Sequence, residues 1–257
     1  MKECAIYTLA HDEKYWLPLW YKYYSQYFSD EDIYIYNHKR AGVEGPDGTE
    51  GLTCNVIEVN DDSLMSTGFI LDFYIKTHSE LLERYKYVMS SDADEILVAD
   101  PKVFDRGLNS YVEVLNIRNA DIVRVTCFDV LHDRFNEPDI IWDEPILGHQ
   151  RKRWINTETY NKVLISSVLP NWSSGRHYEI DNQDRVPDGY MFLIHFRRAD
   201  YKSLKAKNEY NLETACCDNW YEKIVGDEFD QHFDDPCLYN CRTGSVKEIP
   251  KRFHGIM

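Results

Sequence analysis

The chain has 257 residues, of which 43% are hydrophobic and 14% aromatic, and its 29 Lys and Arg against 44 Asp and Glu give a net charge of −15. This apolar content excludes a disordered chain and is enough for one sizeable hydrophobic core. The acidic balance argues against nucleic acid or an anionic bilayer as the principal partner, because both are bound through concentrated basic patches.

The first third of the chain alternates between strand-like and helix-like patterns. Apolar runs rich in β-branched and aromatic residues predict strands, and aromatic or aliphatic residues at spacings of three and four predict helices. The predicted order is strand 4–9, helix 16–27, strand 33–36, loop 37–51, strand 55–59, helix 66–85 and strand 87–89. This rhythm is typical of an α/β fold with a central, mostly parallel sheet flanked by helices.

Ligands of such sheets bind beyond the carboxyl ends of the strands. The chemistry is therefore expected at residues 8–13, at Asn37 and His38, and at residues 90–95. Later in the chain, isolated apolar runs at 122–130, 162–168 and 190–196 are parted by long polar loops, so strands are expected to outnumber helices there.

The last part of the chain differs from the rest in composition and lacks its hydrophobic periodicity. From Leu212 onward Cys, Asp, Asn and Trp are interleaved without clear periodicity. We therefore predict one domain over residues 1–210 and a C-terminal extension over residues 211–257 that packs on it.

The N-terminal apolar run is too short for the hydrophobic part of a signal peptide, and no stretch approaches the ~18 apolar residues that span a bilayer. The seven cysteines are odd in number and irregularly spaced, which is a poor disulfide framework. These features predict a reduced, soluble, cytoplasmic protein with at most peripheral membrane contact. A zinc site at Cys216, Cys217, Cys237 and Cys241 is the less favoured interpretation, since adjacent cysteines cannot both point at one metal without contortion.

The sharpest motif is Ser90-Ser91-Asp92-Ala93-Asp94-Glu95, where an apolar strand delivers three carboxylates within four residues. Like charges this close gain stability only when something positive neutralises them, and Mg²⁺ or Mn²⁺ prefers such oxygen ligands. Asp94 is the expected metal ligand, and Asp92 either shares the metal or reaches a ribose hydroxyl. The plain alternative is an acidic turn that caps the next segment.

This strand followed by Asp92-Ala93-Asp94-Glu95-Ile96-Leu97 resembles the D-x-D region of GT-A glycosyltransferases, in particular bacterial and viral proteins similar to glycosyltransferase family 2. Weaker blocks follow in the family's order over roughly residues 4–210. They are Leu17 to Tyr24, Ile33 to Asn37, Lys162 to Ile165, His177, and Leu193 to Arg198 with Tyr201, Lys202, Ser203 and Lys207. The chain departs from the family at His11-Asp12-Glu13 and at Asn37-His38.

The resemblance implies a GT-A-like fold and a nucleotide-sugar donor, a UDP-, GDP- or dTDP-sugar, whose diphosphate is bridged by Mn²⁺ or Mg²⁺. It implies that Asp12, Asn37 and Asp92 contact the nucleotide. Basic residues that stabilise the leaving diphosphate would be Lys162, Arg197, Arg198 and Lys202. His195 would be a further metal ligand beside Asp92 and Asp94, although a histidine inside an apolar run is as often a core residue.

An inverting transfer also needs a carboxylate that deprotonates the acceptor hydroxyl. Asp143 and Glu144, beside Trp142, are the expected catalytic residues. The alternative, which is commoner for such residues, is an acidic pair in a loop without a catalytic role. By resemblance, the acceptor is a glycan or a lipid-linked sugar, and the reaction belongs to the synthesis of a surface polysaccharide, lipopolysaccharide or protein glycan.

Three other functions compete with this interpretation. A phosphatase of the haloacid dehalogenase type also places D-x-D after a strand, but normally after the first one. A sugar nucleotidylyltransferase needs a glycine-rich phosphate loop, and residues 8–14 contain no glycine. A non-catalytic carbohydrate-binding protein could use the aromatic residues but would not need the acidic motif.

Overall fold

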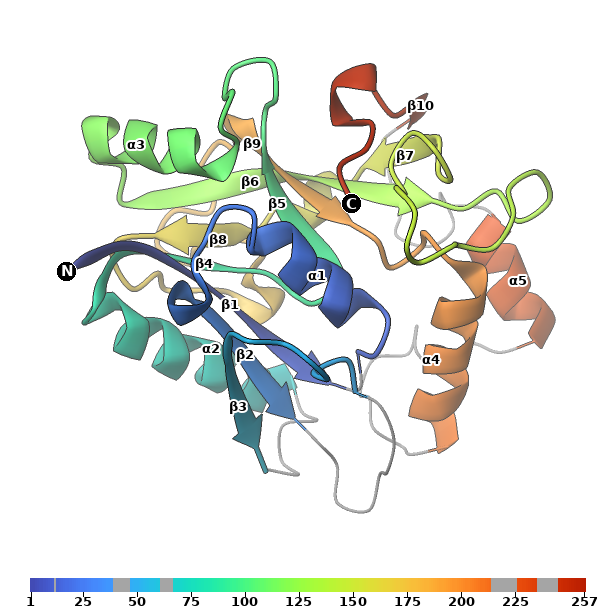
Figure 1. Cartoon of the computed structure of the whole chain (residues 1–257), viewed down its shortest axis with the longest axis horizontal. Helices are drawn as coiled ribbons and strands as arrows, with labels where there is room; N and C mark the ends of the chain where they lie inside the picture. The colour runs from blue at the N-terminus through green and yellow to red at the C-terminus, as the bar shows by residue number, and fades with distance from the viewer. Residues whose placement is uncertain (12, 39–46, 61–66, 214–225, 235–244) are drawn as a thin grey trace. The chain divides into compact units, whose positions relative to one another are not determined.

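The computed structural model describes the chain except for residues 12, 39–46, 61–66, 214–225 and 235–244 (Figure 1). The expected nucleotide contact Asp12 and the four cysteines of the 216–241 region lie outside the described residues. The chain forms two compact units, Met1–Thr126 with Asn161–Leu193 (unit 1) and Cys127–Tyr160 with Ile194–Met257 (unit 2). The boundary expected at residue 210 stays a prediction.

Unit 1 is built on four parallel strands in the order β3-β2-β1-β4, as the alternating pattern predicts. The strands and their connecting helices are β1 (Lys2–His11), α1 (Trp16–Tyr24), β2 (Ile33–His38), β3 (Asn55–Val59), α2 (Thr67–Leu82) and β4 (Tyr85–Ser90). Helix α1 links β1 to β2 and α2 links β3 to β4, so each helix serves as a crossover between parallel strands. The α/β prediction is confirmed.

Antiparallel strands extend this sheet beyond β4. The sequence after the acidic motif forms β5 (Glu95–Ala99), α3 (Leu108–Arg118), β6 (Ile122–Leu131), β8 (Val163–Ser166) and β9 (Asp188–His195). Strand β8 pairs antiparallel with both β4 and β6, and β5 pairs with β9. The three later apolar runs are therefore strands as expected. The sequence did not predict β5 or α3, because β5 has only five residues and α3 carries little helical amphipathicity.

One face of the parallel strands packs on α2 through a tyrosine-rich core. Alternating residues of each strand point to this side, where Tyr7 and Val88 meet Tyr74 and Leu81 of the helix. All four are buried, and each contributes about 1.5–3 kcal/mol through removal of apolar surface from water. The Tyr7 hydroxyl donates to the Tyr74 carbonyl oxygen at 3.3 Å, which satisfies a polar group inside this core.

Helix α1 fixes the segment that follows β4. The Trp20 indole donates to the Ser91 hydroxyl oxygen at 2.8 Å. The Tyr24 hydroxyl oxygen accepts from the Leu97 backbone N–H at 2.8 Å, and the Tyr23 hydroxyl donates to the Leu97 carbonyl oxygen at 2.8 Å. The aromatic stripe of α1 therefore anchors both sides of the acidic motif.

Unit 2 contains the end of β6, which pairs antiparallel with β7 (Arg153–Asn156), and β7 pairs in the same way with β10 (Val246–Glu248). Two helices, α4 (Tyr201–Glu213) and α5 (Gly226–Asp234), pack through Leu204, Phe229 and Phe233. Across the described residues of both units, none of the helices combines the length and apolar character that crossing a bilayer requires.

His78 of α2 lies fully buried in the unit 1 core. Its ring nitrogens lie 3.4 Å from the Tyr7 hydroxyl and 2.8 Å from the Ser166 hydroxyl, and its ring meets Trp172 edge to face. Burial, with a smaller effect of Arg176, lowers its pKa to about 3. The residue is therefore neutral in the folded protein at any pH above about 3.

Because His78 is buried in its neutral form, we expect the folded protein to lose stability in acid. Between pH 6.5 and about 3 the unfolded chain binds a proton at His78 that the folded chain does not, so stability falls as pH falls. His78→Gln should reduce the slope of unfolding free energy against pH between pH 4 and 6 by about 1 kcal/mol per pH unit. Urea unfolding at several pH values measures it. Thr77→Val, a buried change at a residue that does not titrate, should leave the slope intact, and an unaltered slope in His78→Gln would contradict the assignment.

Candidate functional site

The acidic motif stands where the sequence predicts it, directly after β4 at the carboxyl end of the parallel strands. Two hydrogen bonds close it into a tight turn, from the Glu95 N–H to the Asp92 carbonyl oxygen at 2.9 Å and from the Asp92 N–H to Glu95 Oε2 at 3.2 Å. The turn fixes the direction of both carboxylates relative to the sheet.

Two cations of unit 1 meet these carboxylates. Lys162 Nζ lies 2.9 Å from Asp92 Oδ2 and 2.5 Å from Glu95 Oε1. Arg176 Nη2 lies 2.6 Å from Asp92 Oδ1, and its Nη1 donates to the Ser90 hydroxyl oxygen at 2.8 Å. We call Asp92, Glu95, Lys162 and Arg176 the charge cluster. Lys162 directly precedes β8, the antiparallel neighbour of β4, which brings a residue seventy positions away to the motif.

The charge cluster balances two negative against two positive groups. Burial would raise the pKa of Asp92, but Lys162 and Arg176 outweigh it and hold that pKa well below its usual value. Burial likewise opposes the charge of Lys162, and Asp92 and Glu95 raise its pKa. The Lys162, Arg176 and Glu95 side chains are 6%, 4% and 1% exposed, whereas Asp92 is 40% exposed. Asp92 is therefore the member of the charge cluster that solvent can reach.

Arg176 is held on three sides. Its guanidinium lies 3.6 Å from the ring centre of Tyr74, whose hydroxyl donates to Asp92 Oδ1 at 2.9 Å. Its backbone has φ of 60° directly after Gly175 with φ of 71°, a left-handed conformation that is unfavourable for a residue with a side chain. Backbone strain of this kind, of order 1 kcal/mol or more, persists where the surroundings fix the residue. The next residue, His177, has a pKa of about 4 because of burial and the charges of Lys162 and Arg176.

The carboxyl ends of β1 and β2 carry a histidine pair. The rings of His11 and His38 stack with centroids 4.9 Å apart, and their Nδ1 atoms lie 2.9 Å from each other. The neighbouring Asn37 is fully buried and donates to Asp47 at 2.9 Å and to Glu58 at 3.2 Å. The Asn37 amide nitrogen thus donates to two carboxylates of the protein. The expected contact of Asn37 with the nucleotide stays a prediction.

The donor atoms of the motif differ in how well they suit a divalent cation. Both Asp92 oxygens accept hydrogen bonds from cations of the chain, so Asp92 fits a metal poorly and is better suited to a neutral hydroxyl. Asp94 is half-buried, and its role as a metal ligand stays a prediction. A carboxylate is a ligand type that Mn²⁺ and Mg²⁺ take, and both ions keep positions open for phosphate and water.

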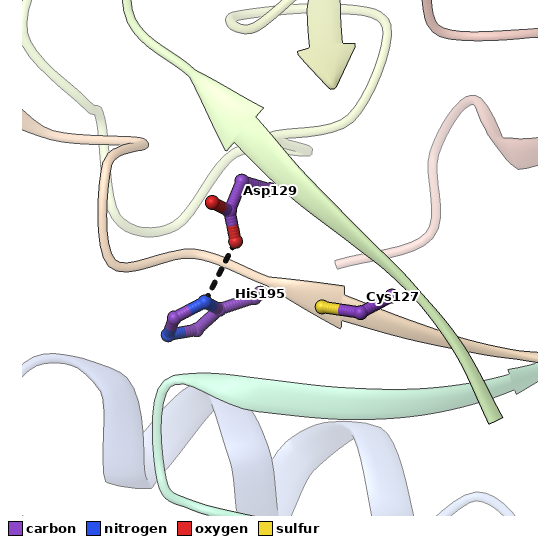
Figure 2. A group of neighbouring side chains, drawn as sticks. All are labelled: Cys127, Asp129 and His195. Carbon is purple, nitrogen blue, oxygen red and sulfur yellow. Dashed lines mark hydrogen bonds and ion pairs between the residues drawn. The ribbon is translucent and has the colours of Figure 1, made fainter. Parts of the chain in front are cut away.

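The other expected site residues belong to unit 2. His195 is buried and its Nδ1 lies 2.8 Å from Asp129 Oδ1 (Figure 2). Arg198 is buried and donates to the Phe233 carbonyl oxygen, which ties it to α5. Lys202 is exposed and pairs with Asp139 at 2.5 Å, and Arg197 is half-buried.

Asp143 and Glu144 are both exposed and lie in the loop between β6 and β7. Glu144 donates its backbone N–H to the Ile141 carbonyl oxygen, and its carbonyl oxygen accepts from Gln150. These bonds define the loop backbone and leave both side chains at its surface, where their catalytic role stays a prediction.

Sequence reasoning missed Arg176 and Tyr74 of the Asp92 environment and Cys127 and Asp129 beside His195. Nothing in the local sequence marks Arg176 or Tyr74, because both contacts depend on folding of distant segments. Cys127 and Asp129 did leave a signal. Their spacing of two within an apolar strand places both side chains on one face.

No protein-family model matches the chain, and no curated protein matches it. Among solved structures, it is similar to residues 1–349 of TarS from S. aureus, with 12% identity, a TM-score of 0.40, and coverage of 93% of this chain and 73% of that chain. A longer TarS structure gives 11% identity and a TM-score of 0.39, with coverage of 90% of this chain and 43% of that chain. At this level of similarity the functional argument rests on the residues of the chain itself.

The charge cluster makes a prediction about stability. Lys162→Met should lower the free energy of unfolding by about 3–5 kcal/mol, because it leaves the buried Glu95 carboxylate without its cation. Adding Glu95→Gln should recover part of the loss, and chemical denaturation of the two single variants and the double variant measures the coupling. Arg106→Met, which breaks an exposed ion pair with Glu113, is the control and should have little effect. Additive single losses would show that Lys162 and Glu95 do not interact.

Proposed function

We propose that the protein is a metal-dependent glycosyltransferase that moves a sugar from a nucleoside-diphosphate sugar to an acceptor hydroxyl with inversion. The observation that carries the proposal is the position of Asp92 at the carboxyl end of β4, where the charge cluster orients a partly exposed carboxylate. Open sheets of this kind bind ligands at that edge. The resemblance of residues 92–97 to the D-x-D region supplies the reaction class.

In this proposal Asp92 binds the donor through a hydrogen bond from a ribose hydroxyl. Lys162 and Arg176 keep the carboxylate ionised and fix both of its oxygens, so little conformational freedom is lost when the donor binds. Lys162 therefore acts by positioning Asp92 and not by direct contact with the diphosphate.

Asp94 is the proposed ligand of Mn²⁺ or Mg²⁺. When bound, the divalent ion offsets the negative charge that develops on the leaving nucleoside diphosphate. Arg197 and Lys202 are proposed, by the resemblance, as basic residues that stabilise a leaving diphosphate, and Arg198 is proposed to hold α5. Asp143 or Glu144 is the proposed base for the acceptor hydroxyl, since their exposed carboxylates are available to an incoming glycan.

The first test is a thermal-shift screen of UDP, GDP, CDP and dTDP with and without Mn²⁺. A ligand that binds only the folded chain stabilises it by about 2.7 kcal/mol at 100 times its Kd. One nucleotide should raise the melting temperature only when metal is present. The absence of a shift with every nucleotide would contradict the proposal.

A variant then tests the motif. Asp94→Asn should reduce donor turnover about 100-fold, because a neutral amide replaces the carboxylate that binds the cation. Turnover is measured as nucleoside diphosphate released from the donor that the screen identifies.

The matched control is Asp184→Asn, which removes an exposed carboxylate elsewhere in unit 1 and should keep full turnover. Equal turnover in the two variants would exclude Asp94 as the metal ligand.

A further inference from the structure

Three metal-ligating side chains meet in unit 2, from two strands. Cys127 and Asp129 lie two positions apart on β6, so they point to the same face of that strand, and His195 is the last residue of β9, which pairs with β6. Figure 2 shows the Cys127 sulfur and the Asp129 carboxylate directed toward the His195 ring.

The ligand atoms of these three residues lie within 4.8 Å of one another. The residues are 0%, 1% and 7% exposed, in the order Cys127, Asp129 and His195. Among the residues that the structure describes, no other group of three His, Cys, Asp or Glu side chains brings its ligand atoms this close together.

The surrounding structure fixes the group. The Cys127 carbonyl oxygen accepts from the Thr157 N–H at 3.1 Å, and Asp129 pairs with Ile155 in the β6–β7 ladder. The ring of Tyr160 stacks against His195 with centroids 6.1 Å apart. The backbone positions of both β6 ligands are thus set by the sheet.

We propose that Cys127, Asp129 and His195 form a binding site for a borderline-soft divalent cation of the Zn²⁺ type. A thiolate, an imidazole and a carboxylate are the three ligand types that Zn²⁺ takes in proteins, and three protein ligands leave its fourth position for water or a ligand. A thiolate disfavours Mg²⁺ and Mn²⁺, so the site is chemically distinct from the one proposed at Asp94.

Loading requires a small expansion and the release of protons. A tetrahedral Zn²⁺ with bonds of about 2.0–2.2 Å to nitrogen and oxygen separates those atoms by about 3.4 Å, whereas Asp129 Oδ1 and His195 Nδ1 now lie 2.8 Å apart. The metal replaces the hydrogen bond between them. The Cys127 thiol proton passes to solvent, and the ring proton of a neutral His195 moves from Nδ1 to Nε2 when Nδ1 binds the metal, so the affinity for Zn²⁺ rises with pH through the thiol.

The alternative is a structural pair, in which Asp129 and His195 hold each other by a hydrogen bond and Cys127 is a small core residue. That arrangement needs no metal. The two interpretations differ in whether the Cys127 sulfur binds an added cation. This binding can be observed without any measurement of turnover.

The test uses the full chain stripped with a chelator and titrated with Zn²⁺ and with Co²⁺ as a spectroscopic probe. Because Cys216, Cys217, Cys237 and Cys241 could also bind zinc, the titration is done in a variant with serine at these four positions. We expect one equivalent of Zn²⁺ that excess Mg²⁺ does not displace, and a near-ultraviolet band from thiolate-to-cobalt charge transfer.

Cys127→Ser in this background should lower the Zn²⁺ affinity about 100-fold or more and abolish the band, while Cys54→Ser keeps both. Where Cys127→Ser does not fold, Asp129→Asn gives the same test through the affinity. Absence of a tightly bound equivalent in the four-serine variant, or binding that persists in Cys127→Ser, would overturn the proposal. The result is independent of the proposed glycosyl transfer, since no step of the titration involves a nucleotide.

Discussion

The buried charges at the end of β4 are the constraint on which the candidate site depends. A carboxylate such as Glu95, with its side chain 1% exposed, is stable in the folded chain only when a cation accompanies it. Lys162 provides that cation for Glu95, and Lys162 and Arg176 together neutralise Asp92. The segments that carry these two cations must therefore fold against β4, so the site is complete only when these segments are in place.

The consequence is a division of labour inside the acidic motif. Glu95 is buried and pairs with Lys162. Both carboxylate oxygens of Asp92 pair with cations of the chain, but its side chain is partly exposed. Asp94, which is half-buried, is the proposed ligand of the divalent cation. Glu95 and Asp92 appear equivalent in the sequence but differ in exposure, and the role proposed for Asp92 follows from that difference.

The fold was predictable where local patterns are strong. The alternating strands and the long helix of the first ninety residues appear as expected, because each buries one apolar face and its period shows in the sequence. The short β5 and the weakly amphipathic α3 were not predicted, since their residues are selected by tertiary contacts. The position of the acidic motif after a strand was predictable for the same reason, but its partners Arg176 and Tyr74 were not.

The sequence alone determined the α/β class, the parallel arrangement at the start of the chain and the edge of the sheet where the acidic motif lies, because hydrophobic periodicity and the succession of strands and helices along the chain can be read locally. Only the tertiary structure decided that Asp92 is neutralised by Lys162 and Arg176 and that His195 lies beside Asp129 and Cys127. Those contacts join residues 66 to 84 positions apart. Charge pairing at that separation depends on which strands become neighbours, and pairing leaves no periodic signal in the chain.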